Sequence, residues 1–409
     1  MPCRPGRHPG GRRVVRGSTT GDGPSVTLSD RELVVDEPDT PRPDGGDSAD
    51  GDDATPFVHA PVMAELIVDL LRDVPDGLYV DATLGGGGHA EAVLDAHPGL
   101  RLLGLDRDDA AIAAASARLA RFGDRVRIVR SGFEDLERIV NETLASDQSD
   151  QSGQSDHSGQ TGHSGHSGQT VHSGHSGQTG SASAADETRG VSAVLFDLGV
   201  SSPQLDEAER GFSYRSGAPL DMRMDRRQAF SAVDVVNEYS FPQLARVIET
   251  YGEERFGGRI ARAIVDARPI QNTAHLAEVV RAAIPAAARR SGGHPAKRTF
   301  QAIRMEVNRE LDQLAEALDG AISVLAPGGR MVVMSYHSLE DRMVKQAMRD
   351  AETGGCTCPQ GLPCVCGAEP TVRLLKRGAW KATEEEVAAN RRAESVRIRA
   401  AERLIPESA

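Results

Sequence analysis

The sequence predicts an α/β protein whose doubly wound, mostly parallel sheet is interrupted by an inserted all-helical segment. In the first half of the chain, short apolar runs alternate with turns and helical stretches. A long stretch of helical pattern without a convincing strand follows. A last apolar run, residues 331–334, comes after the Gly-containing turn 325–330 and completes the sheet.

Four expected strands precede the helical stretch, and each is a short apolar run typical of a buried parallel strand. They are residues 78–81, 100–106, 126–129 and 191–197. The turn 82–88 leads from the first strand into a helix that begins at His89, and an Ala-rich helix over 109–122 follows the second. This order of strand, turn and helix predicts βα units.

The return from the helical stretch to the sheet is predicted to be one long helix. Its apolar residues recur at spacings of three and four, which places them on one helix face. They are Phe300, Ile303, Val307, Leu311, Leu314, Leu318, Ile322 and Leu325.

Composition divides the chain into parts. Residues 1–55 lack an apolar pattern and are predicted to be a disordered N-terminal tail. A His/Ser/Gly-rich segment, 145–189, is predicted to be a flexible insertion, and we interpret its histidines as part of a solvated linker rather than as metal ligands. The remaining parts are the sheet domain at 56–204 and 299–409, the inserted helical substrate domain at 205–298, and a Cys-rich loop at 354–368.

The bulk properties of the chain exclude several classes of protein. A formal net charge of −13 argues against a protein that coats nucleic acid, although it allows a local basic face. No apolar run approaches the ~20 residues that span a bilayer, so we expect no membrane segment. The Arg-rich start is followed by no apolar signal core, and the five cysteines do not resemble a secreted disulfide framework. We therefore expect a cytoplasmic protein.

Asp197 ends the strand 191–197 and is followed by a Gly/Ser/Pro-rich turn. A carboxylate at the carboxyl end of a parallel strand lies where open α/β sheets bind their ligands. Ser201 or Ser202, before Pro203, could also cap a helix, and both interpretations can hold.

The turn 85–88 consists of four glycines, so its backbone can approach a ligand closely. Asp106 ends the next strand, where its carboxylate can accept hydrogen bonds from ribose hydroxyls. Such a pattern binds NAD, FAD or S-adenosylmethionine, or only packs a helix against a strand. Phe133 lies in a loop that could cover an adenine, which favours S-adenosylmethionine, and its alternative role is a core-facing aromatic side chain.

Tyr336 and His337 follow the strand 331–334. We interpret both as lining a substrate pocket in which Tyr336 could stack on a flipped base. The alternative is a helix start with a capping box that begins at Ser338. A serine hydrolase is not indicated, because the chain has no G-x-S-x-G elbow here.

Residues 289–309 are locally basic, with six Lys and Arg residues against one acidic residue. Phosphate binding requires such local patches rather than a high global charge. Lys297, Arg298 and Arg304 are therefore our candidates for RNA contact. The alternative for each is the polar face of an amphipathic helix.

Four of the five cysteines form a tight cluster, Cys356, Cys358, Cys364 and Cys366. They could form a tetrathiolate zinc site, but C-x-C spacing is less diagnostic than paired C-x-x-C. We interpret them as reduced thiols in a loop and predict no metal site.

Taken together, these segments resemble the ribosomal RNA small-subunit methyltransferase H family, whose members are also called MraW-like proteins. Several long matches in fixed order cover most of 57–145 and 190–350, which makes the resemblance specific. The matching stretches are 59–63, 81–89, 105–108, 197–206, 210–213, 219–225, 251–256, 299–304, 325–330 and 335–342.

The resemblance implies a Rossmann-like class I fold and S-adenosylmethionine as cofactor. It also implies a cytidine of 16S rRNA, within the small ribosomal subunit, as substrate, and the helical insertion as substrate domain. The chain departs from the family in its N-terminal tail, in its insertion, and at Tyr336, where we expect Phe. The implied cofactor contacts are Gly87, Gly88, His89, Asp106, Phe133, Asp197 and Gln204.

The sequence thus predicts methyl transfer from S-adenosylmethionine to the exocyclic N4 of a cytidine in the decoding region. This amine is a weak nucleophile because its lone pair is delocalised into the ring, so an acceptor such as Asp197 would help to orient it. Whether Asp197 acts as a base or only orients the amine stays open. The alternatives are a ribosome-assembly factor without catalysis and a nicotinamide oxidoreductase on the same type of sheet.

Overall fold

The structure is a computed structural model, and it describes residues 61–153, 190–199, 208–214, 217–289, 294–359 and 364–406. The predicted tail, residues 154–189 of the predicted insertion, and Gln204 lie outside the described residues. Residues 145–153 of that insertion form the end of helix α4 (Leu136–Gly153).

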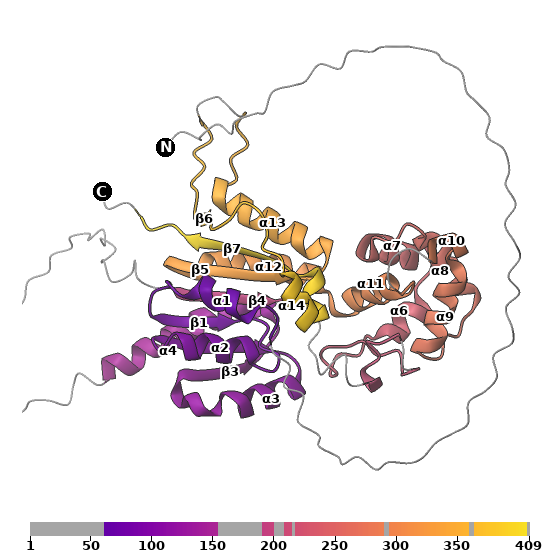
Figure 1. The fold of residues 1–409 in the computed structure, drawn as a ribbon, viewed down its shortest axis with the longest axis horizontal. Coiled ribbons are helices and arrows are strands. Elements are labelled where there is room, and N and C mark those ends of the chain that lie inside the picture. The colour runs from indigo at the N-terminus through magenta and orange to yellow at the C-terminus, as the bar shows by residue number, and fades with distance from the viewer. Residues whose placement is uncertain are drawn as a thin grey trace, which may run out of the picture. The chain divides into compact units, whose positions relative to one another are not determined.

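The described residues contain a seven-stranded sheet in the order β3-β2-β1-β4-β5-β7-β6 (Figure 1). Strands β1 to β5 pair with one another in parallel, whereas β7 is antiparallel to both β5 and β6. The bounds are β1 (Gly77–Asp81), β2 (Leu100–Asp106), β3 (Val126–Arg130), β4 (Val191–Asp197), β5 (Leu325–Ser335), β6 (Val372–Leu374) and β7 (Arg397–Arg403). The predicted doubly wound, mostly parallel sheet is confirmed.

Strand order reverses between β1 and β4, because the chain winds outward from β1 through β2 to β3 and then returns to the other side of β1. Asp81 is level with Leu195, two residues before the end of β4. The carboxyl ends of these parallel strands therefore lie at one edge of the sheet. In open α/β sheets, ligands bind at such a switch point.

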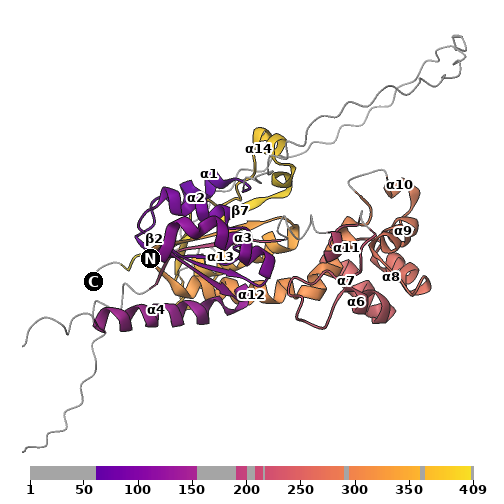
Figure 2. The ribbon, with the colours of Figure 1, turned by 90° about the horizontal axis from the view of Figure 1, so that it is seen from below.

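Both faces of the sheet are covered because neighbouring strand residues point to opposite sides. Tyr79 belongs to one hydrophobic cluster with residues of helices α1 to α3, whereas Val80 belongs to another with residues of α4, α12 and α13. These two sets of helices flank the sheet (Figures 1 and 2). Residues 78–81 of β1 and 191–196 of β4 are buried, as a sheet with helices on both faces requires. The bounds are α1 (Ala64–Leu71), α2 (Gly88–Ala96), α3 (Asp109–Leu119), α12 (Glu310–Val324) and α13 (Ser338–Thr353).

Helices α6 to α11 gather into one group with a hydrophobic core of its own (Figures 1 and 2). Ile248, Ile260 and Leu276, from three of these helices, are fully buried in this core. The bounds are α6 (Ala232–Glu238), α7 (Phe241–Gly252), α8 (Gly257–Asp266), α9 (Thr273–Ala283), α10 (Ala286–Arg289) and α11 (Lys297–Asn308).

The prediction of one long helix from Phe300 to Leu325 is wrong. The chain forms two helices, α11 and α12, and Arg309 between them has a left-handed conformation with φ 51°. Phe300 packs into the core of the helical group, whereas Leu318 packs against the sheet. The apolar residues that recur at helical spacing therefore divide between two hydrophobic cores, and the backbone changes direction at Arg309 between them.

Strands β6 and β7 were not predicted from the sequence. The β7 segment consists of Arg, Ala, Glu and one Ile, a composition that favours helix rather than strand. Glu402 of β7 is nevertheless buried, and it pairs with Arg330 of β5 at 2.9 Å and with Arg373 of β6 at 2.7 Å. Pairing with the sheet thus overrides the local preference.

Among the described residues, no helix combines the length and the apolar character that crossing a membrane requires.

Candidate active site

Three carboxylates end neighbouring parallel strands at the carboxyl edge of the sheet. Asp81 ends β1, Asp106 ends β2 and Asp197 ends β4. Asp106 and Asp197 therefore lie where the sequence places them, on either side of the point at which strand order reverses.

The glycine turn and Asp106 are held together by main-chain hydrogen bonds. Gly85 N donates to Asp106 Oδ2, and Asp108 N donates to Oδ1, both at 2.8 Å. Each carboxylate oxygen keeps a second lone pair for a ligand. Burial raises the pKa of Asp106 above its ordinary value, while these two hydrogen bonds lower it.

The turn leaves room for a ligand beside the backbone. A Cβ at Gly86 would meet no atom within 4 Å, whereas Gly87 has φ +75° and packs closely on Leu119 and Ala115 of α3. Gly88 begins α2 and lies against Pro61. The open turn and the available oxygens of Asp106 fit a nucleoside with free ribose hydroxyls.

Asp197 is held by three partners. Its main-chain N–H donates to Thr83 Oγ1 at 2.6 Å, and Oδ1 accepts a hydrogen bond from the hydroxyl of Tyr336 at 2.8 Å. Oδ2 lies 3.5 Å from Nδ1 of His89. Burial raises the pKa of Asp197 above its ordinary value, while His89 and the Tyr336 hydrogen bond act in the opposite direction.

His89 is a buried residue near the start of α2. Its Nε2 lies 2.9 Å from the carbonyl oxygen of Val62, and because a carbonyl only accepts, Nε2 carries a proton. The contact between Nδ1 and Asp197 is then attractive only when a proton lies on one of these two groups. His89 thus contacts Val62 through one ring nitrogen and Asp197 through the other.

Asp81 also lies at this edge of the sheet. It belongs to the stretch 81–89 that resembles the family, but it was not among the predicted site residues. Its side chain is 2% exposed, and it accepts hydrogen bonds from Tyr79 Oη at 3.3 Å and from Thr83 N at 3.2 Å. Burial raises the pKa of Asp81 to about 7. Asp81 ends a strand just as Asp197 does, so the same pattern could have identified it.

Tyr336 and His337 are positioned by Glu340 at the start of α13. Glu340 Oε2 accepts hydrogen bonds from the main-chain N–H of Tyr336 at 2.9 Å and of His337 at 3.3 Å. His337 is the N-cap, and its Nδ1 accepts a hydrogen bond from Glu340 N at 3.4 Å. The expected capping box therefore exists but begins at His337 rather than at Ser338.

Phe133 follows β3 and is half-buried. Its ring makes an edge-on contact with Phe196 of β4 at 6.2 Å, and the guanidinium of Arg107 lies over it at 5.7 Å from its centre. The contact with Phe196 accounts for the core-facing role that the sequence left open. Both of the roles considered for Phe133 remain compatible with this placement.

The three candidates for RNA contact differ in their surroundings. Lys297 and Arg298 begin α11 and are exposed. Arg304 instead makes a two-pronged ion pair with Glu310, with both N–O distances at 2.8 Å and both side chains largely buried. Our proposal for RNA contact therefore rests on Lys297 and Arg298.

Glu253 connects the start of α11 with the start of α13. Its carbonyl oxygen accepts a hydrogen bond from Arg298 at 3.1 Å. Its carboxylate accepts hydrogen bonds from the hydroxyl of Ser338 and, at 2.9 Å, from Arg342. The structure thus brings one basic candidate close to the segment that carries Tyr336.

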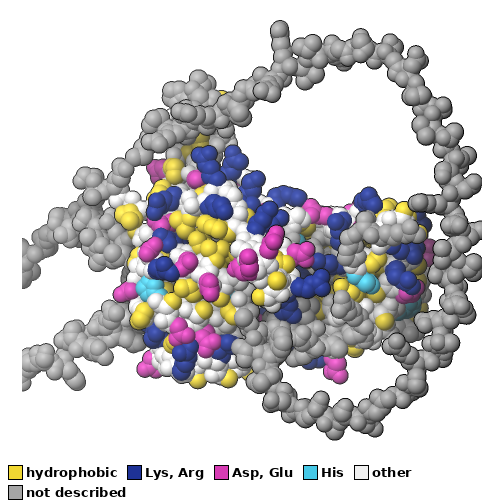
Figure 3. All heavy atoms as spheres, viewed as in Figure 1, with side chains coloured by type: hydrophobic (Ala, Val, Ile, Leu, Met, Phe, Trp, Pro, Cys, Tyr) yellow, Lys and Arg dark blue, Asp and Glu magenta, His cyan; other side chains and the backbone are white. Residues whose placement is uncertain are grey.

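Basic side chains do not dominate the face shown in Figure 3, where Lys and Arg lie among acidic and apolar groups. This mixed surface agrees with the acidic net charge of the whole chain. A nucleic acid would therefore be recognised through local patches.

Comparisons with known proteins give one consistent result. The sequence profile of the MraW methylase family matches residues 56–404. The ribosomal RNA small subunit methyltransferase H of Thermobifida fusca is 49% identical over 352 residues, which are 84% of this chain and 93% of that protein. The protein of the same name from Heliobacterium modesticaldum is 44% identical and covers 85% of this chain and 99% of its own length.

These matches confirm the family that the sequence motifs resemble, and with it the Rossmann-like class I methyltransferase fold and S-adenosylmethionine as cofactor. The nicotinamide oxidoreductase alternative is thereby set aside. The chain belongs to the MraW methylase family.

Proposed function

We propose that this protein transfers a methyl group from S-adenosylmethionine to the exocyclic N4 of a cytidine in the decoding region of 16S rRNA, within the small ribosomal subunit in the cytoplasm. The observation that carries the proposal is the carboxylate of Asp197, held by Tyr336 and His89 at the edge of the sheet where strand order reverses. The names of the relatives, ribosomal RNA small subunit methyltransferase H, support the same substrate class.

The cofactor would be held by residues that fit its separate parts. Asp106 would accept hydrogen bonds from the ribose hydroxyls, because each oxygen keeps a free lone pair. Gly87 and Gly88 would admit its methionine end, since no side chain intervenes. His89 would border this end, and Phe133 would cover the adenine. Gln204, the remaining candidate contact, lies outside the described residues.

S-adenosylmethionine supplies an electrophilic methyl group on a sulfonium, so the protein need not activate the donor. The protein's task is to place the amine and to draw proton density from its N–H groups. Asp197 would accept a hydrogen bond from the amine, and its raised pKa makes it a stronger acceptor than an exposed carboxylate. Thr83, Tyr336 and His89 would fix the direction of that carboxylate.

Tyr336 would also present its ring to the target base. Its hydroxyl is committed to Asp197, which limits rotation of the side chain. A base that stacks on this ring would therefore place its exocyclic amine near the carboxylate. His337 would border the same pocket, although its Nδ1 is engaged by the cap of α13.

The test uses small ribosomal subunits from a strain that lacks this gene. Purified protein and isotope-labelled S-adenosylmethionine are added, and the 16S rRNA is digested and mapped by mass spectrometry. We expect one labelled N4-methylcytidine in the decoding region, and no label with Asp197→Ala at unchanged thermal stability. Label at another base would overturn the assignment of the substrate. Turnover near that of the wild type in Asp197→Ala would overturn the role of Asp197.

The same experiment separates the enzyme from a ribosome-assembly factor without catalysis. Such a factor would bind the subunit and leave it unlabelled. Binding is therefore measured in parallel by sedimentation of the protein with the subunit.

A further inference from the structure

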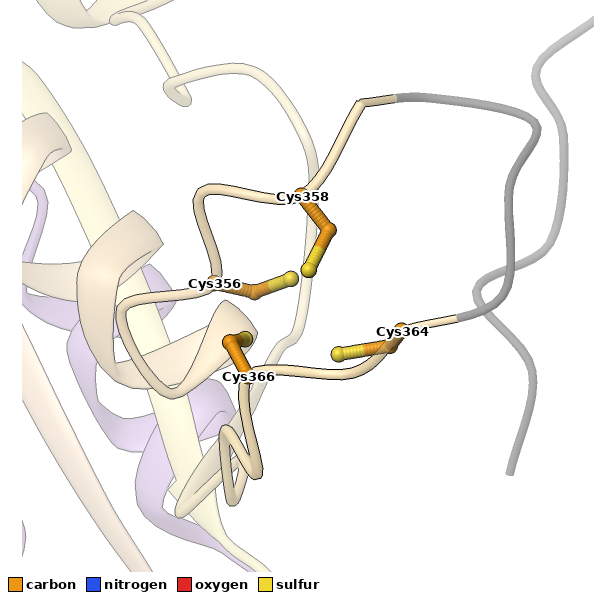
Figure 4. Close-up of side chains that lie close together, drawn as sticks. All are labelled: Cys356, Cys358, Cys364 and Cys366. Atoms are coloured by element: carbon orange, nitrogen blue, oxygen red, sulfur yellow. The ribbon is translucent and has the colours of Figure 1, made fainter.

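We propose that Cys356, Cys358, Cys364 and Cys366 bind one Zn²⁺ ion as a structural tetrathiolate site, a role independent of the proposed methyl transfer. The four Sγ atoms all lie within 4.8 Å of one another. Figure 4 shows the four side chains converging on a common centre from two arms of one loop.

The spacing of the sulfur atoms suits zinc. In a tetrahedral site with Zn–S bonds of ~2.3 Å, neighbouring sulfur atoms lie about 3.8 Å apart. The longest separation here would therefore shorten by at most about 1 Å on binding, since all four atoms lie within 4.8 Å of one another. Small rotations of the cysteine side chains can supply such a change.

The stem of the loop brings the two arms together. Thr371 N donates to Ala351 O at 2.9 Å, which joins the chain after the cysteines to the end of α13 before them. Gly354 ends α13 with φ +63°, and a Cβ there would lie only 2.5 Å from the backbone of Glu369. This close approach requires glycine, and it holds Cys356 and Cys366 on facing arms.

Hydrophobic burial does not account for the arrangement of this loop. In the described parts of the loop, 355–359 and 364–370, every residue is exposed or half-buried, and Val365 is 88% exposed. Small segments without an apolar core are commonly stabilised by a metal whose ligands come from both arms. The cysteines are the side chains here that can provide such a link.

The donor set indicates which metal binds and what it does. Soft thiolate ligands in a tetrahedral arrangement favour zinc over hard cations such as magnesium or calcium. Four protein ligands leave no coordination position for water or substrate, so the ion would be structural rather than catalytic. The sequence alone favoured reduced thiols, because C-x-C spacing does not show that the two pairs meet.

The experiment uses the full chain without an affinity tag, purified under reducing conditions and without chelator. The zinc concentration is measured by elemental mass spectrometry, and the molar ratio of zinc to protein is calculated. We expect one zinc per chain in the wild type and in Cys3→Ser, the matched control for removal of a thiol outside the cluster. We expect the zinc to be lost in Cys364→Ser and in Cys356→Ser.

A second measurement does not depend on the variants. The wild type is stripped of metal by a chelator and titrated with Co²⁺, whose absorption spectrum shows thiolate-to-metal charge-transfer bands only when sulfur is bound. Strong bands that saturate at one Co²⁺ per chain support the site, and this spectrum also distinguishes it from metal on the histidines of the insertion. Absence of these bands in freshly reduced protein would overturn the proposal.

Discussion

The hydroxyl of Tyr336 donates a hydrogen bond of 2.8 Å to Oδ1 of Asp197, across 139 residues of sequence. Tyr336 follows β5 and Asp197 ends β4, two neighbouring parallel strands whose carboxyl ends meet at the site. Burial and the carboxylate both raise the pKa of Tyr336 above its ordinary value, so its hydroxyl stays protonated and remains a donor. The bond orients the carboxylate before any substrate binds.

Tyr336→Phe should slow methylation by about tenfold, because one hydrogen bond to a charged acceptor is lost while the ring is kept. That bond lowers the pKa of Asp197, so its loss should raise this pKa and shift the acidic limb of the rate profile to higher pH. Turnover is measured against pH with small subunits. Tyr239→Phe is the control, since it removes a hydroxyl bonded to Glu306 in the helical group. An unchanged profile in Tyr336→Phe would contradict the assigned role.

Asp106→Ala should weaken binding of S-adenosylmethionine by about 10- to 100-fold, because the ribose loses its acceptor and two main-chain N–H groups lose theirs. The dissociation constant is measured by calorimetry. Asp124→Ala, at an exposed position, should bind the cofactor as the wild type does. Equal affinities for the two variants would exclude a contact between Asp106 and the cofactor.

Asp81 should make the stability of the protein depend on pH. The folded-state pKa is raised from 3.8 to about 7, so between these values the folded chain binds the proton and the unfolded chain does not. Rising pH therefore lowers the free energy of unfolding across this window, by up to about 4 kcal/mol. Asp81→Asn cannot titrate and should lack this contribution.

Urea unfolding of the wild type and Asp81→Asn at several pH values between 4 and 8 tests this. The stability of the variant relative to the wild type should increase with pH and level off above pH 7. Asp124→Asn should show a constant difference. If the difference in free energy of unfolding between Asp81→Asn and the wild type were also constant, the Asp81 carboxylate of the folded wild type would already be ionised at pH 4, and the prediction would be wrong.

Lys297→Ala and Arg298→Ala should each weaken binding to the small subunit and reduce the salt dependence of the binding constant by about one phosphate contact. Cofactor affinity should not change. Binding is measured at several salt concentrations. If the slope of the logarithm of the binding constant against the logarithm of the salt concentration equals that of the wild type in both variants, these side chains do not contact phosphate.

Arg304→Ala provides the contrast, because its guanidinium pairs with the largely buried Glu310. Leaving that carboxylate without its partner should lower the free energy of unfolding by roughly 3 kcal/mol. Thermal unfolding measures this loss. A variant as stable as the wild type but deficient in RNA binding would instead return Arg304 to the set of RNA contacts.

The sequence by itself determined the βα units, the glycine turn and the carboxylates at the strand ends. These features depend on local periodicity and on the rule that parallel strands end at one edge, so Asp106 and Asp197 could be placed without coordinates. The motifs also determined the family. Asp81 ends a strand in the same way, so the same rule could have placed it at the site.

Only the tertiary structure decided which distant groups meet. It broke the apolar periodicity of α11 and α12 at Arg309, placed β7 in the sheet against its helical composition, and engaged Arg304 with Glu310. It also joined Tyr336 to Asp197 and brought the two cysteine pairs together. Such contacts depend on how separate elements pack, and the free energy of that packing is absent from any local pattern of residues.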